Sequence, residues 1–244
     1  MPIHIHAEPG SVAPRVVAVG DPGRAQLLAE TLLDDARVVN RNRGYLVYTG
    51  TYKDARITVA THGVGGPSAL IVLEELVELG ARYVVRLGTA GALRKGMKIG
   101  DLVVATSAGC NYGGAGLGQY YPGVCPPLAP DPRLTLVLHE EASSRARTFL
   151  GPVFSSDAFY AEDKDFASRI GSMGFVAVEM EVAPLYALSW LRGFRASALL
   201  MISNSLVEDL GYASGEQLRE SVLRASEAVL EALARVPTEG SQPL

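Results

Sequence analysis

The chain has 244 residues, of which 48% are hydrophobic and 20% charged, as is typical of a globular protein with a sizeable core. Its net charge of −4 argues against a surface that binds nucleic acid, and no apolar run approaches the roughly 20 residues that a membrane span needs. The N-terminus lacks the basic and apolar stretches of a secretion signal, so we expect a cytoplasmic protein.

The N-terminal part predicts strands followed by glycine-rich turns. His4 and His6 alternate as in a short strand, and we expect no metal ion there because no second cluster of ligands accompanies them. The apolar run 15–19 predicts a buried strand, after which Gly20 and Arg24 lie in a turn that opens a helix. Amides at a helix N-terminus beside an arginine suit an anion, although the same residues also form ordinary turns between a strand and a helix.

The next segments predict a strand pair, at 45–52 and 55–61, and a helix over 67–79. Between them, the glycine-rich segment 62–68 begins like a dinucleotide-binding fingerprint. Ser68 stands where the third glycine belongs, and no acidic residue ends a following strand, so we reject dinucleotide binding.

The stretch 81–91, ARYVVRLGTAG, predicts a buried strand at 83–87 and a glycine-rich turn at 88–91 that contains Thr89. Arg86 lies inside the apolar run, where an unpaired guanidinium is unfavourable, so we expect an anion beside it. The amides of the turn would serve the same anion. The alternative is that Arg86 takes part in a structural ion pair.

The middle of the chain predicts a strand at 101–106 and a long loop at 108–132, which is rich in glycine, tyrosine and proline. Long loops in compact domains often form a lid or a wall of a site. For Cys110 and Cys125, which lie in this loop, we expect reduced thiols rather than a disulfide. The segments that follow predict a helix, a strand and an acidic helix at 134–147, 149–154 and 163–170.

The C-terminal third predicts a strand at 175–178 that runs into Glu179, Met180 and Glu181 and then a helix to residue 191. Acidic residues are common at helix N-termini for electrostatic reasons alone. Here two acids flank a methionine at a junction of strand and helix, which also suits the binding of hydroxyl groups. A strand at 195–202 then ends in Ser203 and Asn204, and an amphipathic helix over 216–236 follows.

Strands alternate with helices and no internal repeat or linker interrupts them. We therefore predict a single α/β domain at residues 1–236, with a mixed, partly barrel-like sheet flanked by helices, and a disordered tail at 237–244. Polar residues cluster where the strands end, and in open α/β sheets those ends form the ligand crevice. Two arginines with glycine-rich turns suit phosphate, and carboxylates with methionine and phenylalanine suit hydroxyls and a flat apolar group. A nucleoside or sugar phosphate has both features.

Several segments resemble the nucleoside phosphorylase family, in particular its bacterial hexameric purine type; the family also includes uridine phosphorylases. The matching segments are GDPGR at 20–24, HGVG at 62–65, RLGTAG at 86–91, FY at 159–160, VEME at 178–181 and SN at 203–204. They follow the family order over nearly the whole chain. The resemblance implies the nucleoside phosphorylase fold and reversible phosphorolysis without a cofactor, in which a nucleoside and inorganic phosphate give a free base and ribose 1-phosphate.

The resemblance also implies a role for individual residues. The expected phosphate-binding residues are Gly20, Arg24, Arg43, Arg86 and Thr89. The expected nucleoside-binding residues are His4, Phe159, Val178, Glu179, Met180, Glu181, Ser203 and Asn204. Of these, Arg86, Glu181 and Asn204 are the expected catalytic residues, with Glu181 on the ribose hydroxyls and Asn204 at N7 of the base. Arg43 and His4 would reach in from a neighbouring subunit, which implies a dimer unit and, commonly for this family, a hexamer built as a trimer of dimers.

One departure from the family concerns the base. Members of broad purine specificity carry an aspartate and an arginine where this chain has Asn204 and Gln217. An asparagine amide can donate to N7 and accept from a 6-amino group, so we expect adenosine to be preferred over inosine and guanosine. Glu208 and Asp209 are alternative sources of an acid.

Three other functions stay open at this point. A uridine phosphorylase and a nucleoside hydrolase would share the fold, although the hydrolase would have no use for Arg24, Arg43 and Arg86. A non-catalytic nucleoside-binding module would result if Asn204 abolished catalysis.

Overall fold

The computed structural model describes residues 2–211 and 215–237, with only the backbone described for residues 215–217. Nine strands of this described part form one mixed sheet in the order β2-β3-β4-β1-β5-β8-β7-β6-β9. The strands are β1 (Arg15–Val19), β2 (Asp34–Asn40), β3 (Val47–Tyr52), β4 (Ala55–Thr61), β5 (Tyr83–Ala92), β6 (Leu102–Cys110), β7 (Thr148–Ser155), β8 (Ala177–Glu179) and β9 (Arg195–Ser205).

The sheet closes on itself at one end. β5 pairs with β8 and also with β9, so the five strands β5, β8, β7, β6 and β9 form a closed, barrel-like ring. The other four strands extend from β5 as an open wing, in which β1 lies parallel to both β4 and β5. The predicted α/β fold with a partly barrel-like sheet is confirmed.

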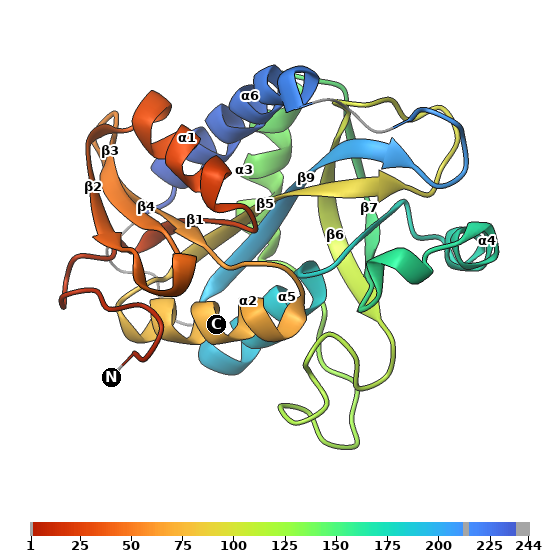
Figure 1. The fold of residues 1–244 in the computed structure, drawn as a ribbon, viewed down its shortest axis with the longest axis horizontal. Coiled ribbons are helices and arrows are strands. Elements are labelled where there is room, and N and C mark those ends of the chain that lie inside the picture. The colour runs from red at the N-terminus through yellow and green to blue at the C-terminus, as the bar shows by residue number, and fades with distance from the viewer. Residues whose placement is uncertain (1, 212–214, 238–244) are drawn as a thin grey trace.

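Helices cover both faces of the sheet (Figure 1). They are α1 (Pro22–Leu32), α2 (Gly66–Glu78), α3 (Pro132–Ser143), α4 (Lys164–Ser172), α5 (Val182–Arg192) and α6 (Gly215–Ala234), with short 3₁₀ turns η1 (Asn42–Gly44) and η2 (Phe159–Ala161). One hydrophobic cluster joins α2 and α5 to the sheet, and a second joins α1, α3 and α6 to it. None of the helices in residues 2–211 and 215–237 is long and apolar enough to cross a membrane.

Aspartates set the start of three helices. Asp21, Asp131 and Asp163 each accept a hydrogen bond from a backbone amide in the first turn of α1, α3 and α4, at 2.8 Å in each case. Such capping satisfies amides that have no partner inside the helix. At α1 it fixes the turn between Gly20 and Arg24, so the predicted strand, turn and helix are confirmed there.

Two local predictions are wrong. The glycine-rich turn expected at 88–91 does not exist, because β5 continues to Ala92 and pairs with β9 along its length. Its glycines serve close packing instead: a Cβ at Gly91 would lie 2.4 Å from Leu206 Cδ1. His4 and His6 are not in a strand either, because side chains rather than a neighbouring strand accept the hydrogen bonds of their amides.

Other differences concern the ends of elements. β6 continues to Cys110, so the predicted loop at 108–132 begins only after it, and both cysteines are free thiols. β2 was not predicted, because this strand at the edge of the sheet is mostly polar and partly exposed. The side chain of Gln217 and residues 238–244 of the predicted tail lie outside what the structure describes.

Candidate active site

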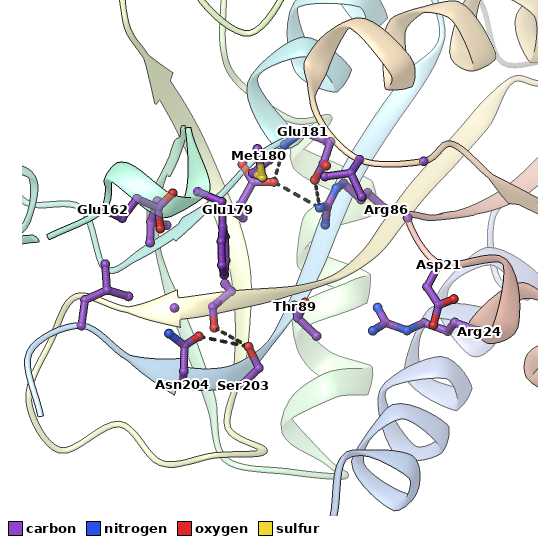
Figure 2. Close-up of a pocket in the computed structure, with 18 of the residues that line it drawn as sticks. Asp21, Arg24, Arg86, Thr89, Glu162, Glu179, Met180, Glu181, Ser203 and Asn204 are labelled. Atoms are coloured by element: carbon purple, nitrogen blue, oxygen red, sulfur yellow. Dashed lines mark hydrogen bonds and ion pairs between the residues drawn. The ribbon is translucent and has the colours of Figure 1, made fainter. Parts of the chain in front are cut away.

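A cavity of about 440 Å³ lies where β1, β5, β8 and β9 bring their polar residues together. Its walls come from the turn before α1, the loop after β4, the second half of β5, η2 with the residue after it, the junction of β8 with α5, and the end of β9 (Figure 2). The predicted site residues in its lining are Gly20, Arg24, Arg86, Thr89, Phe159, Val178, Glu179, Met180, Glu181, Ser203 and Asn204. These residues come from distant parts of the chain, and the fold brings them to one cavity.

Arg86 is buried at the centre of the cavity wall, with 5% of its surface exposed. Its Nη2 contacts Glu181 Oε2 at hydrogen-bond distance and lies 3.4 Å from Glu179 Oε2. The guanidinium crosses its own strand above Gly88, where a Cβ would lie only 1.6 Å from Nη1. Gly88 is thus required by the path of the arginine side chain and not by a turn.

Electrostatics keep this pair charged. Burial alone would lower the pKa of Arg86, but Glu181 and Glu179 raise it above its ordinary value. Burial alone would also raise the pKa of Glu181, but Arg86 outweighs that effect and lowers it. The second oxygen of Glu181 accepts a hydrogen bond of 2.6 Å from the amide of Gly65. Glu181 therefore presents an ionised carboxylate to the cavity.

Glu179 is engaged mainly with its own chain. Its carboxylate accepts hydrogen bonds from the amides of Glu181 and Val182, at 2.7 Å and 2.9 Å, and from the hydroxyl of Ser155. It thereby satisfies amides at the start of α5 and positions Glu181. Its place in the lining agrees with the prediction, and these contacts give it a structural role as well.

One end of the cavity is suited to an anion. Arg24 lies there with Gly20 and Thr89, and its Nη1 is 3.4 Å from the carbonyl of Leu87 (Figure 2). Burial lowers the pKa of Arg24, Asp21 partly offsets this, and the neighbouring Arg86 lowers it further. Two guanidinium groups that repel each other at a partly dry site favour a bound anion between them.

The other end of the cavity suits a flat ring with polar edges. Phe159 and Val178 supply apolar surface, and Asn204 is almost buried. The hydroxyl of Ser203 is 3.2 Å from Oδ1 of Asn204, which orients the amide nitrogen of Asn204 away from Ser203 (Figure 2). Asn204 can therefore donate a hydrogen bond to a ligand from that nitrogen.

Sequence reasoning missed Glu162, which also lines the cavity. It lies in the exposed acidic stretch that leads into α4, where one more acid gives no signal of its own. Burial raises the pKa of Glu162, and a hydrogen bond with Ser156 offsets part of that shift. The alternative acids Glu208 and Asp209 are not in the lining.

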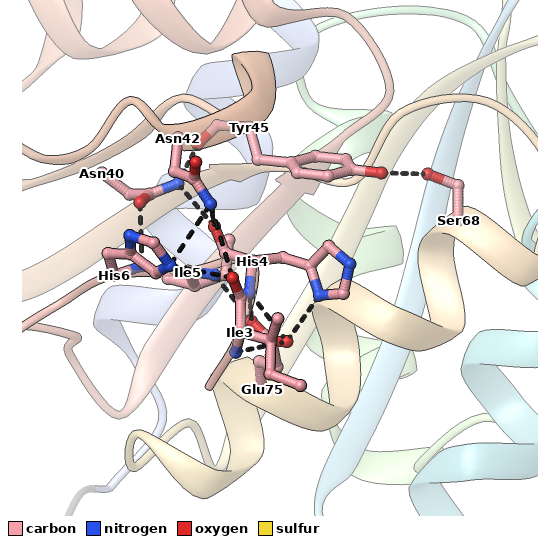
Figure 3. Close-up of polar contacts among 9 residues, drawn as sticks. All are labelled: Ile3, His4, Ile5, His6, Asn40, Asn42, Tyr45, Ser68 and Glu75. Carbon is pink, nitrogen blue, oxygen red and sulfur yellow. Dashed lines mark hydrogen bonds and ion pairs between the residues drawn. The ribbon is translucent and has the colours of Figure 1, made fainter. Parts of the chain in front are cut away.

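His4 and Arg43 do not line this cavity. Arg43 lies in η1, is exposed, and has a left-handed backbone with φ of 55°. His4 Nδ1 lies 2.8 Å from Oε1 of Glu75. The carboxylate of Glu75 also accepts hydrogen bonds from the backbone amides of residues 3–5 (Figure 3). Their expected role in a neighbouring subunit's site stays a prediction.

The chain is similar to known proteins over nearly its whole length. The family model of the phosphorylase superfamily matches residues 14–237. A guanosine phosphorylase of Halorubrum lacusprofundi is 34% identical over 237 residues, which cover 94% of this chain and 97% of that protein. A DeoD-type purine nucleoside phosphorylase of Streptococcus suis is 36% identical over 236 residues, or 96% and 99% of the two chains. The corresponding protein of Roseobacter denitrificans is 36% identical over 207 residues, or 84% and 88%.

Proposed function

The chain belongs to the phosphorylase superfamily, and we propose that its cavity catalyses the reversible phosphorolysis of purine nucleosides. Inorganic phosphate attacks the ribose and the purine base leaves, which gives ribose 1-phosphate. The observation that carries this proposal is the order of groups along one cavity: Arg24 at one end, Arg86 with Glu181 in the middle, and Asn204 at the other end (Figure 2). That order corresponds to phosphate, ribose and base.

In this proposal the phosphate end provides the nucleophile. Arg24, Arg86, Thr89 and the amide of Gly20 hold the phosphate and orient it beneath the sugar. As the bond between sugar and base breaks, positive charge builds on the ribose, and the phosphate stabilises it. No metal ion or cofactor is needed for this step.

Glu181 and Asn204 act on the nucleoside. The carboxylate of Glu181 accepts hydrogen bonds from the ribose hydroxyls, and its negative charge favours the cationic sugar in the transition state. Met180 lies beside the sugar, and Phe159 and Val178 hold the base. Asn204 donates an N–H to N7 of the leaving purine, which takes up negative charge as it departs.

The base preference is a finer part of the proposal. An Asn204 amide that donates to N7 and accepts from a 6-amino group would favour adenosine. Two observations favour a second candidate, a preference for 6-oxopurines: the hydroxyl of Ser203 already lies against the Asn204 oxygen, and one relative is a guanosine phosphorylase. The variant Asn204→Asp distinguishes them, because a gain in 6-oxopurine turnover supports the first candidate and an unchanged rate supports the second.

A homo-oligomer completes the proposal, with His4 and Arg43 of one subunit at the sugar and phosphate of its neighbour. Val64 at the rim of the cavity is 73% exposed, and Ile3 beside His4 is 72% exposed. Large apolar side chains at these positions favour a second subunit that covers them. Dimer units arranged as a hexamer would agree with the family resemblance.

The test is to incubate the protein with adenosine, inosine, guanosine and uridine, each with and without phosphate, and to measure free base and ribose 1-phosphate. We expect purine release that requires phosphate, and a loss of about 10²- to 10³-fold in kcat/KM for Arg86→Gln or Arg24→Gln. The exposed Arg82 gives the matched control, since Arg82→Gln should leave the rate unchanged.

Other results would contradict the proposal in distinct ways. Release of base at the same rate without phosphate would indicate a hydrolase, and uridine cleavage without purine cleavage would indicate a uridine phosphorylase. Nucleoside binding without any turnover would indicate a non-catalytic binding module.

A further inference from the structure

Glu162 is a cavity residue to which the proposed mechanism gives no role. It follows η2 directly, and its amide donates to the carbonyl of Phe159 at 3.4 Å. The next residue, Asp163, caps α4 through a hydrogen bond of 2.8 Å to the amide of Phe166. The backbone on both sides of Glu162 is therefore fixed, so its side chain starts from a defined point on the cavity wall.

The carboxylate of Glu162 lies at the base end of the cavity. Figure 2 shows it on the side of Asn204 and far from Arg24, with Arg86 between. It is half-buried, and the nearly buried Ser156 forms a hydrogen bond with it. In the described residues no ion pair neutralises it, in contrast to Glu181, which contacts Arg86. A partly buried acceptor with one hydroxyl partner still has lone pairs for ligand donors.

The chemistry of purines shows which donors these are. If Asn204 lies at N7, the adjoining edge of the purine, which carries N1 and C2 on the six-membered ring, faces another wall of the cavity. Guanine presents two donors on that edge, N1–H and the 2-amino group, and hypoxanthine presents N1–H alone. Adenine has an unprotonated N1 there, whose lone pair repels a carboxylate.

Resting on the proposed function, we propose that the Glu162 carboxylate binds the N1–H and 2-amino donors of a 6-oxopurine and so determines activity toward guanosine. Two charge-assisted hydrogen bonds in parallel are strong and directional. Asn204 and Glu162 then act on adjoining edges of the base, and the ratio of guanosine to adenosine turnover reflects both.

The variant Glu162→Gln tests this directly. A glutamine loses the charge and turns one acceptor into a donor, so it opposes guanine and suits the N1 and 6-amino group of adenine. We expect kcat/KM for guanosine to fall by about 10- to 100-fold, that for inosine to fall less, and that for adenosine to stay the same or rise. Asp165, an exposed acid in the first turn of α4, gives the control Asp165→Asn, which should leave all three values unchanged.

Two results would overturn the role of Glu162. An equal loss for the three nucleosides would mean that the residue only supports the wall, and three unchanged values would mean that it does not contact the base. The affinities of free guanine and adenine, measured by calorimetry in the presence of phosphate, give a readout that does not depend on turnover. If guanine binds the wild type and binds Glu162→Gln more weakly, the contact with Glu162 is supported. This holds even if the wild type releases no base from nucleosides, because that result would contradict only the proposed function.

Discussion

His62 gives a prediction whose size follows from its surroundings. The residue comes directly after β4, is 1% exposed, and lies beneath the cavity near Gly20 and Arg86. Burial and the neighbouring positive charge of Arg86 lower its pKa to about 4, from an ordinary value of about 6.5. In the folded protein the imidazole is therefore half protonated near pH 4 and almost entirely neutral at pH 5 and above.

The sign of the effect on stability follows from this shift. Below pH 6.5 the unfolded chain takes up a proton at His62 and the folded chain does not, so acid favours unfolding. The contribution is fully present above pH 6.5 and declines as the pH falls toward 4. Taking the two pKa values, the free energy of unfolding falls by about 2 kcal/mol between pH 7 and pH 5 because of this one residue.

The assay is urea unfolding at pH 7, 6 and 5 at one protein concentration, because association would also change the midpoint. Between pH 7 and pH 5, the free energy of unfolding of the variant His62→Gln should fall by about 2 kcal/mol less than that of the wild type. This difference does not depend on how stable the variant is at pH 7. His139, which is half-buried in α3 and outside the cavity lining, supplies the matched control substitution His139→Gln. If the free energy of unfolding fell equally for His62→Gln and the wild type between pH 7 and pH 5, the buried neutral imidazole would not be the cause of the wild type's loss of stability in acid.

Two further predictions rest on single contacts. Gly88→Ala places a methyl group against the Arg86 guanidinium, so we expect the KM for phosphate to rise by about tenfold or more, and an unchanged KM would contradict the phosphate role of Arg86. Glu75→Gln removes the charge that holds His4 and the amides of residues 3–5, and should lower the free energy of unfolding by about 1–3 kcal/mol at pH 7. Burial acts to raise the pKa of Glu75, but these hydrogen bonds lower it below its ordinary 4.5. The wild type should therefore lose this contribution, and approach the variant, only as the pH falls below that value; a difference that persisted at lower pH would show that the charge is not responsible.

The sequence predicted the alternation of strands and helices well, because buried strands such as β1 are continuous apolar runs bounded by glycine or proline. It failed where an element is defined by contacts from distant parts of the chain. Gly88 and Gly91 lie inside β5, where their lack of a side chain makes room for Arg86 and Leu206. Nothing local separates such a glycine from one in a turn. β2 was missed for a similar reason, because an edge strand has no continuous apolar run.

The candidate site shows the same division. The sequence indicated that Arg86, inside an apolar run, needs a partner, and left open whether this is an anion or an ion pair. The structure shows an ion pair with Glu181, which is 95 residues away in the chain. Nothing in the sequence indicated Glu162, because its place in the cavity wall depends on how η2 and α4 are positioned in the fold. Its neighbours in sequence do not reveal that position. Arg86 and Glu181 could thus be singled out because they lie in or next to buried apolar runs, whereas Glu162 could not, because its neighbours in sequence are polar.

The contact between Arg86 and Glu181 has a consequence for catalysis at varying pH. Glu181 has one oxygen on Arg86 and the other on the amide of Gly65, and both contacts favour the ionised form. Its charge is therefore already in place at neutral pH to stabilise a cationic ribose, and it stays there as the pH falls toward 5. Glu162 differs, because burial shifts its pKa upward whereas that of Glu181 is shifted downward. As the pH is lowered, guanosine turnover should therefore decline at a higher pH than adenosine turnover. A decline at the same pH for both substrates would point to Glu181, since its protonation would slow both alike.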